Sequence, residues 1–416
     1  MPKKVLMFGW EFPPAITGGL GMACYGITKG LANNGIDITF VMPSANEKEF
    51  SHLNIVDASK VSKVSKLHNT HVYKIDSPIF PYANEEEYFK FMSLYLNNNP
   101  TSGTFSSNYG KDIFKETQRY ATTAETIAQS ENFDIIHCHD WMTAQAGIEA
   151  KKATGLPLVM HVHATEMDRT LGNPDQRIYD LEKDGMLLAD KIIAVSERTK
   201  LTILKYYPID ENKIVVVHNA IEQLKNPINF KSKVFKKDKI VLFLGRMTMM
   251  KGPEYFLKAA QRALEINPNI KFVMGGTGDS LKKTIDESIK LNIAKNVLFL
   301  GFYSPTMVDR ICSSADLFIM PSVSEPFGIV PLEAVRNKIP VIISKSSGVS
   351  EVLPNALKVD FWDIDEMTNK MLAVLKYKPL HTQLRRHALD DIKNLTWDNQ
   401  TKEITHVYNS LYTNIL

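Results

Sequence analysis

The sequence of 416 residues is poor in cysteine and contains no long apolar run. Its three cysteines, Cys24, Cys138 and Cys312, lie far apart and form no CxxC pair. This excludes a disulfide framework and the usual zinc motifs, and it indicates a reducing compartment. No apolar stretch approaches the roughly 20 residues of a membrane span, and Glu11 interrupts the first one too early for a secretory signal. We therefore expect a cytoplasmic protein without a transmembrane segment.

The sequence also has little net charge. It contains 49 Lys and Arg against 46 Asp and Glu, which gives +3. This excess is too small to predict a nucleic-acid partner. The lysines between Lys231 and Lys239 could touch acidic lipid, but a solvated linker is the simpler interpretation. The sequence leaves the oligomeric state open.

Short apolar runs alternate with helical patterns in the first half of the chain. The run from Val5 to Trp10 predicts a buried strand. A glycine cluster, residues 18–21, and a helical pattern through Leu31 follow it. Further strands are expected at residues 36–42, 134–139, 158–163 and 191–196. Such alternation is typical of a parallel, doubly wound sheet. Residues 44–112 are hard to interpret, although 97–110 resemble a loop.

A second series of the same kind follows the lysine-rich stretch. Strands are expected at 240–245, 270–274, 297–301, 317–320 and 340–343, with a helix at 253–267. We predict an α/β protein with two Rossmann-like, doubly wound parallel-sheet domains that face each other across a cleft. The expected divisions are 1–221, a linker at 222–236, 237–390, and 391–416. The last part contains an amphipathic helix at 397–412, which is expected to cross back to the first domain.

The strongest chemical signal is the segment from Glu325 to Glu333, which reads E-P-F-G-I-V-P-L-E. An expected strand leads into it, and a helix is expected to begin near Ile329. Two carboxylates eight positions apart therefore bracket a helix start. Carboxylates accept hydrogen bonds from sugar hydroxyls, and backbone N–H groups at a helix start bind anions.

A second signal pairs Gly245-Arg246 with Lys251-Gly252. An expected strand delivers Arg246, and Lys251 follows at a helix entrance. Two fixed cations would stabilise the negative charge of a departing diphosphate. Gly18 and Gly19 likewise follow a strand and precede a helix, where backbone N–H groups can meet a phosphate. The pattern is not G-x-G-x-x-G, which counts against a dinucleotide dehydrogenase.

The block from Glu325 to Glu333 resembles the E-x7-E motif of retaining glycosyltransferases with the GT-B fold. The opening K-V-L-M-F-G-W-E-F-P-P…G-G-L-G resembles glycogen and starch synthases. The resemblance extends from Val5 to about Trp397. It implies that Glu325 lies against the transferred sugar and that Glu333 holds the ribose hydroxyls. The remaining residues that it implies for donor binding are Phe327, Gly328, Ile329, Val330 and Gly276.

The same resemblance assigns roles to the cations and to polar residues of the first half. Arg246 and Lys251 would hold the diphosphate. His163 would lie near the reacting centre. The H-D-W segment places His139 and Asp140 near the cleft, on the acceptor side. Because the two cations would take the place of a metal, no metal ion or other cofactor is expected.

One segment matches a metal-binding pattern of other glycosyltransferases. Asp363-Ile364-Asp365 fits D-x-D, but it immediately precedes a helical stretch at 366–375. We therefore interpret one of these aspartates as a helix N-cap.

These observations predict a metal-independent hexosyltransferase that retains configuration at the anomeric carbon. Glucose from UDP-glucose or ADP-glucose is the expected sugar, and an α-glucan is the leading acceptor. A lipid-linked or surface-polysaccharide precursor is the alternative acceptor. A sugar-nucleotide epimerase and a non-catalytic nucleotide-sugar sensor are the alternative functions. No carboxylate nucleophile is recognised in the first half, which disfavours a retaining hydrolase.

Overall fold

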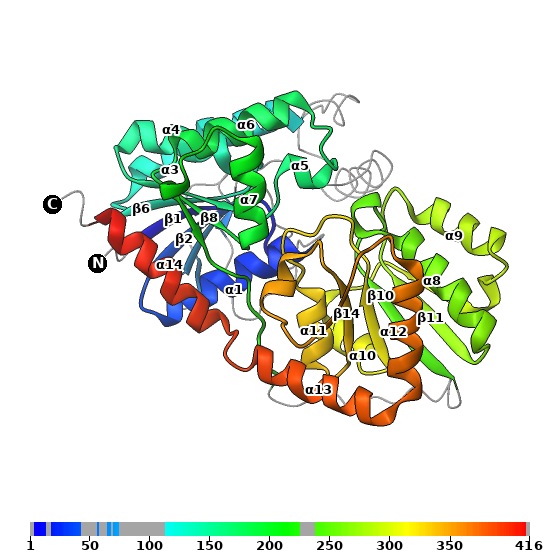
Figure 1. Cartoon of the computed structure of the whole chain (residues 1–416). Helices are drawn as coiled ribbons and strands as arrows, with labels where there is room; N and C mark the ends of the chain where they lie inside the picture. Colours follow the sequence, from blue (N-terminus) through cyan, green and yellow to red (C-terminus); the bar gives the residue numbers. More distant parts are fainter. Residues whose placement is uncertain are drawn as a thin grey trace.

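The structure is a computed structural model that describes residues 4–13, 18–42, 113–224 and 238–412, together with the backbone of three short strands between residues 56 and 74. The expected loop at 97–110, the lysines from 231 to 237 and most of the expected linker at 222–236 lie outside these ranges. Figure 1 shows two α/β bodies side by side. Among the described residues, no helix has the length and apolarity that a membrane span needs.

The first sheet has the strand order β3-β5-β2-β1-β6-β7-β8-β9, and β4 pairs with β5. All of these pairings are parallel except β4 with β5, which is antiparallel. The strands are β1 (Lys4–Phe8), β2 (Asp37–Met42), β3 (Val56–Asp57), β4 (Ser65–Leu67), β5 (Thr70–Lys74), β6 (Ile135–His139), β7 (Leu158–Val162), β8 (Lys191–Ala194) and β9 (Ile214–Val216).

Helices cover both faces of this sheet. One face packs on α3, α4, α6 and α7, and the other packs on α1 and the C-terminal helix α14. The first-domain helices are α1 (Gly19–Asn33), α3 (Ile113–Ser130), α4 (Trp141–Thr154), α5 (Glu166–Arg169), α6 (Gln176–Leu188), α7 (Glu197–Tyr206) and the 3-10 helix η2 (Glu211–Lys213).

The second sheet is entirely parallel and has the order β12-β11-β10-β13-β14-β15. This is the order 3-2-1-4-5-6 of a doubly wound nucleotide-binding sheet. In such a sheet the chain adds strands toward one edge and then, between the first and fourth strands, switches to adding them toward the other edge. The strands are β10 (Lys239–Leu244), β11 (Ile270–Gly275), β12 (Val297–Gly301), β13 (Leu317–Met320), β14 (Val341–Ser344) and β15 (Leu357–Val359).

Helices also cover both faces of the second sheet. One face packs on α8 and α12, and the other packs on α10, α11 and α13. The remaining helices are α8 (Pro253–Ile266), α9 (Leu281–Lys290), α10 (Pro305–Cys312), α11 (Val330–Arg336), α12 (Ile364–Lys376), α13 (Lys378–Ile392), α14 (Trp397–Tyr412), and the 3-10 helices η3 (Met249–Lys251), η4 (Ala294–Asn296) and η5 (Gly348–Glu351). The prediction of two doubly wound parallel sheets is confirmed.

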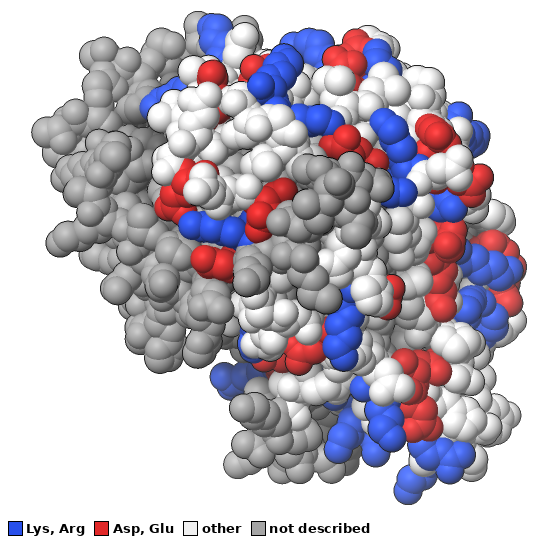
Figure 2. Space-filling view, turned by 90° about the vertical axis from the view of Figure 1, so that its left-hand side faces the viewer, with Lys and Arg blue, Asp and Glu red and all other residues white. Residues whose placement is uncertain are grey.

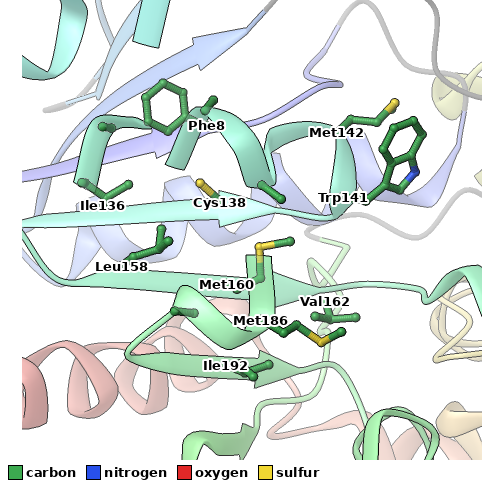
Figure 3. Close-up of a cluster of buried hydrophobic side chains, with 14 of the residues drawn as sticks. Phe8, Ile136, Cys138, Trp141, Met142, Leu158, Met160, Val162, Met186 and Ile192 are labelled. Carbon is green, nitrogen blue, oxygen red and sulfur yellow. The ribbon is translucent and has the colours of Figure 1, made fainter. Parts of the chain in front are cut away.

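Strand alternation explains how one strand serves both a core and a polar cluster. All five residues of β6 are buried. Ile136 and Cys138 point into the apolar cluster under α3 and α4, which Figure 3 shows together with Leu158 and Met160 of β7. The intervening histidines point to the opposite face, because successive side chains of a strand alternate between faces.

The last helix crosses from the second body to the first, as Figure 1 shows in red. Its apolar residues Ile404, Val407, Tyr408 and Leu411 are buried against the first sheet and α1. The predicted helix at 397–412 and its amphipathic spacing are therefore confirmed. Strand β1 and helix α14 consequently lie on the same body.

Candidate active site

The candidate site lies at the carboxyl ends of the parallel strands, where open α/β sheets bind their ligands. A cavity of about 260 Å³ opens there, and residues from both bodies line it. The sequence-predicted residues that line it are Gly18, Gly19, Asp140, His163, Arg246, Lys251, Gly276, Glu325, Phe327, Gly328, Ile329, Val330 and Glu333. Of the predicted site residues, His139 alone is not among the lining residues.

Glu325 follows β13 and points at a cation. It is 5% exposed. Its Oε2 lies 2.5 Å from Nζ of Lys251 and accepts a hydrogen bond from the Ser322 hydroxyl at 3.3 Å. Lys251 ends the short helix η3, so the pair joins the loops that follow β10 and β13. β10 and β13 are the neighbouring strands at which the strand order reverses, so the two loops meet at the middle of the second sheet.

Close approaches of the backbone shape the second-domain wall. A Cβ on Gly276 would lie 1.8 Å from the carbonyl oxygen of Gly245, and one on Gly252 would lie 2.2 Å from that of Pro321. Gly276 and Gly252 also have positive φ angles, 137° and 66°. Glycine is therefore required at both positions. The tight loops place Arg246 and Lys251 on one side of the cavity.

Glu333 lies in the first turn of α11, eight residues after Glu325. Gly328 makes the turn between them at φ 99°, and a Cβ there would lie 3.1 Å from Cγ of Glu325. Burial raises the pKa of Glu333 to about 7, with Arg336 opposing the rise and Asp309 adding to it. The ion pair between Arg336 and Asp309, at 2.6 Å, leaves Glu333 to face the cavity.

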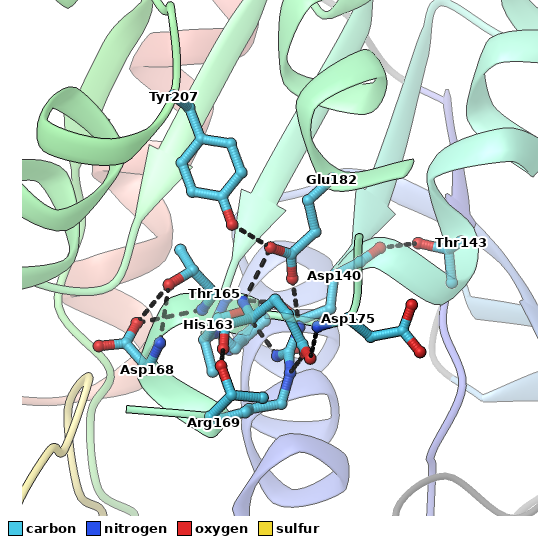
Figure 4. A network of polar contacts seen from close by, with 12 residues as sticks. Asp140, Thr143, His163, Thr165, Asp168, Arg169, Asp175, Glu182 and Tyr207 are labelled. Carbon is cyan, nitrogen blue, oxygen red and sulfur yellow. Dashed lines mark hydrogen bonds and ion pairs between the residues drawn. The ribbon is translucent and has the colours of Figure 1, made fainter. Parts of the chain in front are cut away.

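Asp140 joins two strand ends of the first domain. Its Oδ1 accepts hydrogen bonds from the backbone N–H groups of His163, at 2.7 Å, and Ala164, at 3.3 Å. Its backbone has φ 59° and ψ 178°, a conformation that residues other than glycine rarely adopt. Such strain persists only where surrounding contacts impose it, and Figure 4 shows Asp140 beside His163.

His139 lies behind His163 and not on the cavity wall. It is fully buried, and its Nδ1 lies 2.9 Å from Nε2 of His163. The sequence predicts His139 near the cleft on the acceptor side, and it lies one layer behind the cavity wall because alternation along β6 turns its side chain toward α1. Burial lowers the pKa of His163, although Asp140 acts to raise it. Burial also lowers the pKa of His139, and His137 and His163 add to the effect. Both rings are therefore neutral at pH 7.

Several cavity residues are not among the predicted site residues. Glu11, Arg169, Asn219 and Tyr303 all line the cavity. Arg169 donates to Glu166, to Glu182 and to the carbonyl oxygen of Ala164, in the network of Figure 4. Glu11 lies three residues after the end of β1, within the W-E-F-P-P part of the opening motif, so that motif could have identified it.

Two carboxylates of the first domain therefore reach the cavity, namely Glu11 and Asp140. The sequence predicts Asp140 on the acceptor side, and it singles out no carboxylate nucleophile in the first half. The carboxylate of Asp140 is occupied by two backbone N–H groups. Glu11 is 2% exposed.

The D-x-D segment caps a helix. Asp363 is the N-cap of α12, and its Oδ1 accepts a hydrogen bond from the Glu366 backbone N–H at 2.8 Å. Within the described ranges, two other groups have the composition of a transition-metal site: Cys24 with His139 and His163, and His137 with His139 and His161. Hydrogen bonds join His139 to His163 and His137 to His161, at 2.9 and 3.2 Å.

Two family profiles match the chain. The starch synthase catalytic domain matches residues 4–211, and glycosyl transferases group 1 matches residues 225–390. An uncharacterized glycosyltransferase of Methanocaldococcus jannaschii is 28% identical, over 97% of both chains. Glycogen synthase of Mycobacterium tuberculosis is 22% identical, over 85% of this chain and 80% of its own length.

Solved structures show the same fold. Sucrose-phosphate synthase of Thermosynechococcus elongatus superimposes with a TM-score of 0.77 at 15% identity, over 99% of this chain and 100% of its own. The catalytic domain of starch synthase IV of Arabidopsis thaliana, bound to ADP and acarbose, gives 0.69 at 16% identity, over 99% of both chains. These likenesses confirm the predicted GT-B fold.

Proposed function

We propose that this chain, which belongs to the starch synthase and group 1 families of GT-B glycosyltransferases, moves glucose from a nucleotide sugar to a growing α-glucan with retention of configuration. One observation carries the proposal. Two separate motifs, one with Glu325 and Glu333 and one with Arg246 and Lys251, converge with His163 of the other domain on one cavity.

The chemistry of the second-domain wall suits a sugar nucleotide. Lys251 and Arg246 provide positive charge where a diphosphate would leave, and such fixed charges stabilise a transition state more than a ground state. Glu325, held between Lys251 and Ser322, is positioned to accept hydrogen bonds from hydroxyls of the sugar. Glu333 would accept from the ribose hydroxyls. His163 would lie on the other side of the sugar.

We infer a front-face transfer. The acceptor hydroxyl oxygen forms a bond to the anomeric carbon on the side that the diphosphate leaves. The bond between that carbon and the phosphate oxygen breaks, and the departing phosphate takes the hydroxyl proton. A double displacement would need a carboxylate nucleophile about 5 Å from a general acid. Asp140 is held by backbone N–H groups, which disfavours it for that role.

The α-glucan acceptor is favoured by the similarity to glycogen and starch synthases, of which the Arabidopsis structure binds ADP and acarbose. The alternative acceptor is a lipid-linked or surface-polysaccharide precursor. A sugar-nucleotide epimerase or a nucleotide-sugar sensor would use the same cavity without transfer.

The test is donor hydrolysis without acceptor, with UDP-glucose, ADP-glucose, UDP-GlcNAc and GDP-mannose, followed by transfer to α-glucan. Without acceptor, we expect one glucose donor to release nucleoside diphosphate slowly. With α-glucan present, the release should be faster, and NMR should show an α-linked product. Glu325→Ala and Lys251→Ala should lower turnover about 100-fold or more. Glu265→Ala, on the exposed side of α8, is the control.

Each contrary outcome has a distinct meaning. Unchanged turnover in Lys251→Ala would contradict the role of that lysine. Conversion of the donor to another sugar nucleotide would indicate an epimerase. Donor binding with neither hydrolysis nor transfer to any acceptor would indicate a sensor, and inversion of configuration would reject the front-face mechanism.

A further inference from the structure

We propose that side chains of the first domain hold the loop that carries Glu325, and that Ser196 is a positioning residue for the transfer reaction. This proposal rests on the proposed function, because it concerns the geometry of Glu325. The loop is residues 322–328, which we call the catalytic loop. Its two residues on either side of Glu325, Ser324 and Pro326, each contact buried polar groups of the other domain.

The contact after Glu325 is made by the start of α7. The hydroxyl of Ser196 donates to the carbonyl oxygen of Pro326 at 2.6 Å, and the Thr199 hydroxyl donates to the same oxygen at 3.3 Å. Both donors are fully buried. Ser196 is also the N-cap of α7 and accepts from the Thr199 backbone N–H at 3.0 Å. Its hydroxyl proton is therefore available for Pro326.

The contact before Glu325 is made by Asp168. The hydroxyl of Ser324 donates to Oδ1 of Asp168 at 3.0 Å, and Nη2 of Arg198 donates to the Ser324 hydroxyl at 3.3 Å. Thr165 occupies the other carboxylate oxygen of Asp168, with its hydroxyl at 2.8 Å, as Figure 4 shows. Asp168 is thus fixed with one oxygen directed at the catalytic loop.

A third contact anchors the segment that pairs with the catalytic loop. Glu351 of η5 accepts from the Glu197 and Arg198 backbone N–H groups, at 2.9 and 3.0 Å, and lies 2.8 Å from Nε2 of His218. The same segment donates from Gly348 N–H to the carbonyl oxygen of Glu325 at 2.9 Å. A Cβ on Gly348 would lie 2.1 Å from Pro326 O and 2.6 Å from Cβ of Ser196.

These contacts make the geometry of Glu325 depend on the other domain. The residues on both sides of it, Ser324 and Pro326, contact first-domain groups, while its own backbone N–H and carbonyl pair with Ser346 and Gly348 of the second domain. Its side chain is held by Lys251 of the second. Opening of the cleft at α7 would break the contacts with the first domain and leave the contact with Lys251 intact. Misplacement of a reacting group by about 1 Å can cost about 100-fold in rate, so closure and chemistry are coupled through this loop.

Two variants test the proposal. Ser196→Ala removes the bond to Pro326 but also the cap of α7. Ser324→Ala removes the bond to Asp168 and leaves that cap intact. Thr202→Ala is the matched control, since its hydroxyl donates only within α7, to the Arg198 carbonyl oxygen. Each is compared with wild type by transfer kinetics, thermal unfolding, and hydrogen exchange of peptides covering 322–330 and 345–352.

We expect both serine variants to lose about tenfold or more in kcat, with donor KM changed less than about threefold. Glu325 and Gly348 amides should exchange faster, because their partners move with the loop. Thr202→Ala should match wild type. Unchanged kcat or unchanged exchange in both serine variants would overturn the proposal.

The exchange measurement separates this proposal from the proposed function. If wild type acts on no donor while both serine variants exchange faster than Thr202→Ala, the loop is held as proposed and the assigned activity is wrong. If wild type transfers glucose and the variants differ from it only in thermal stability, the activity stands and the positioning role is rejected.

Discussion

At the scale of single residues, Glu333 combines a stability cost with a proposed binding role. Burial raises its pKa to about 7 from an ordinary value of 4.5. The folded state therefore binds a proton more tightly than the unfolded chain between these values. Its contribution to stability falls as pH rises through that interval and is lowest above about pH 7. Keeping this buried carboxylate ionised at neutral pH therefore lowers the stability of the fold, a cost that residues of binding sites often carry.

We predict that Glu333→Gln raises the free energy of unfolding by about 1–3 kcal/mol at pH 8, because it removes the charge that burial penalises. The gain should disappear near pH 4.5, where wild-type Glu333 is protonated in the folded state. Thermal unfolding from pH 4.5 to pH 8 measures it. Donor affinity should fall in the same variant, since an amide is a weaker acceptor for hydroxyls than a carboxylate.

The exposed Glu265 provides the control for the preceding prediction. Glu265→Gln should change neither the pH profile nor donor affinity. A Glu333→Gln variant with wild-type stability at pH 8 would contradict the raised pKa. A variant that is stabilised and binds donor normally would leave the electrostatic argument intact and remove the ribose role.

Site residues that follow a strand end in the sequence could be predicted. Site residues elsewhere in the sequence could be predicted less well. Glu325 and Lys251 lie in short motifs that follow apolar runs. Arg169 does not, since its place in the cavity depends on Glu166 and Glu182, which join α5 to α6. The burial of His139 depends on the face of β6 that α1 covers, and no local pattern contains this.

At the scale of elements, the contact between α1 and α14 has almost no free space. A Cβ on Gly26 of α1 would lie 2.1 Å from the indole ring of Trp397. One on Gly30 would lie 2.7 Å from the Thr401 hydroxyl. The two glycines, four residues apart, form one face of the helix and allow α14 to approach closely. The same helix begins at Gly19 on the cavity wall.

We predict that Gly26→Ala lowers the free energy of unfolding by about 1–3 kcal/mol, although alanine is the better helix former. The reason is the displacement of the Trp397 ring. Thermal unfolding measures the loss. Gly26→Ala combined with Trp397→Leu should be less destabilised than the sum of the single variants. Strict additivity would show that the two residues do not share this contact.

Elements could be predicted where the signal is continuous along the chain. The central parallel strands are buried on both faces, so they appear as unbroken apolar runs such as residues 240–244. The antiparallel strand β4 lacks such a run, and we did not expect it. The close packing of α14 on α1 depends on Gly26 and Gly30, whose role can be seen only once the partner helix is in place.

At the scale of the whole molecule, the charges of the cavity come from two separate domains. The second contributes Arg246, Lys251 and the two glutamates, and the first contributes Glu11, Asp140 and Arg169. On the face shown in Figure 2, Lys and Arg side chains are interspersed with Asp and Glu, in keeping with a net charge of +3. Binding of the proposed dianionic diphosphate would therefore depend on the local cations that the folded cavity assembles.

This arrangement predicts turnover without a divalent metal ion. In the proposed function Arg246 and Lys251 would supply the charge that Mg²⁺ or Mn²⁺ would otherwise provide, and Asp363 caps α12. Donor turnover after EDTA treatment and gel filtration should stay within about twofold of the untreated enzyme. Loss of activity that Mg²⁺ or Mn²⁺ restores would contradict this prediction.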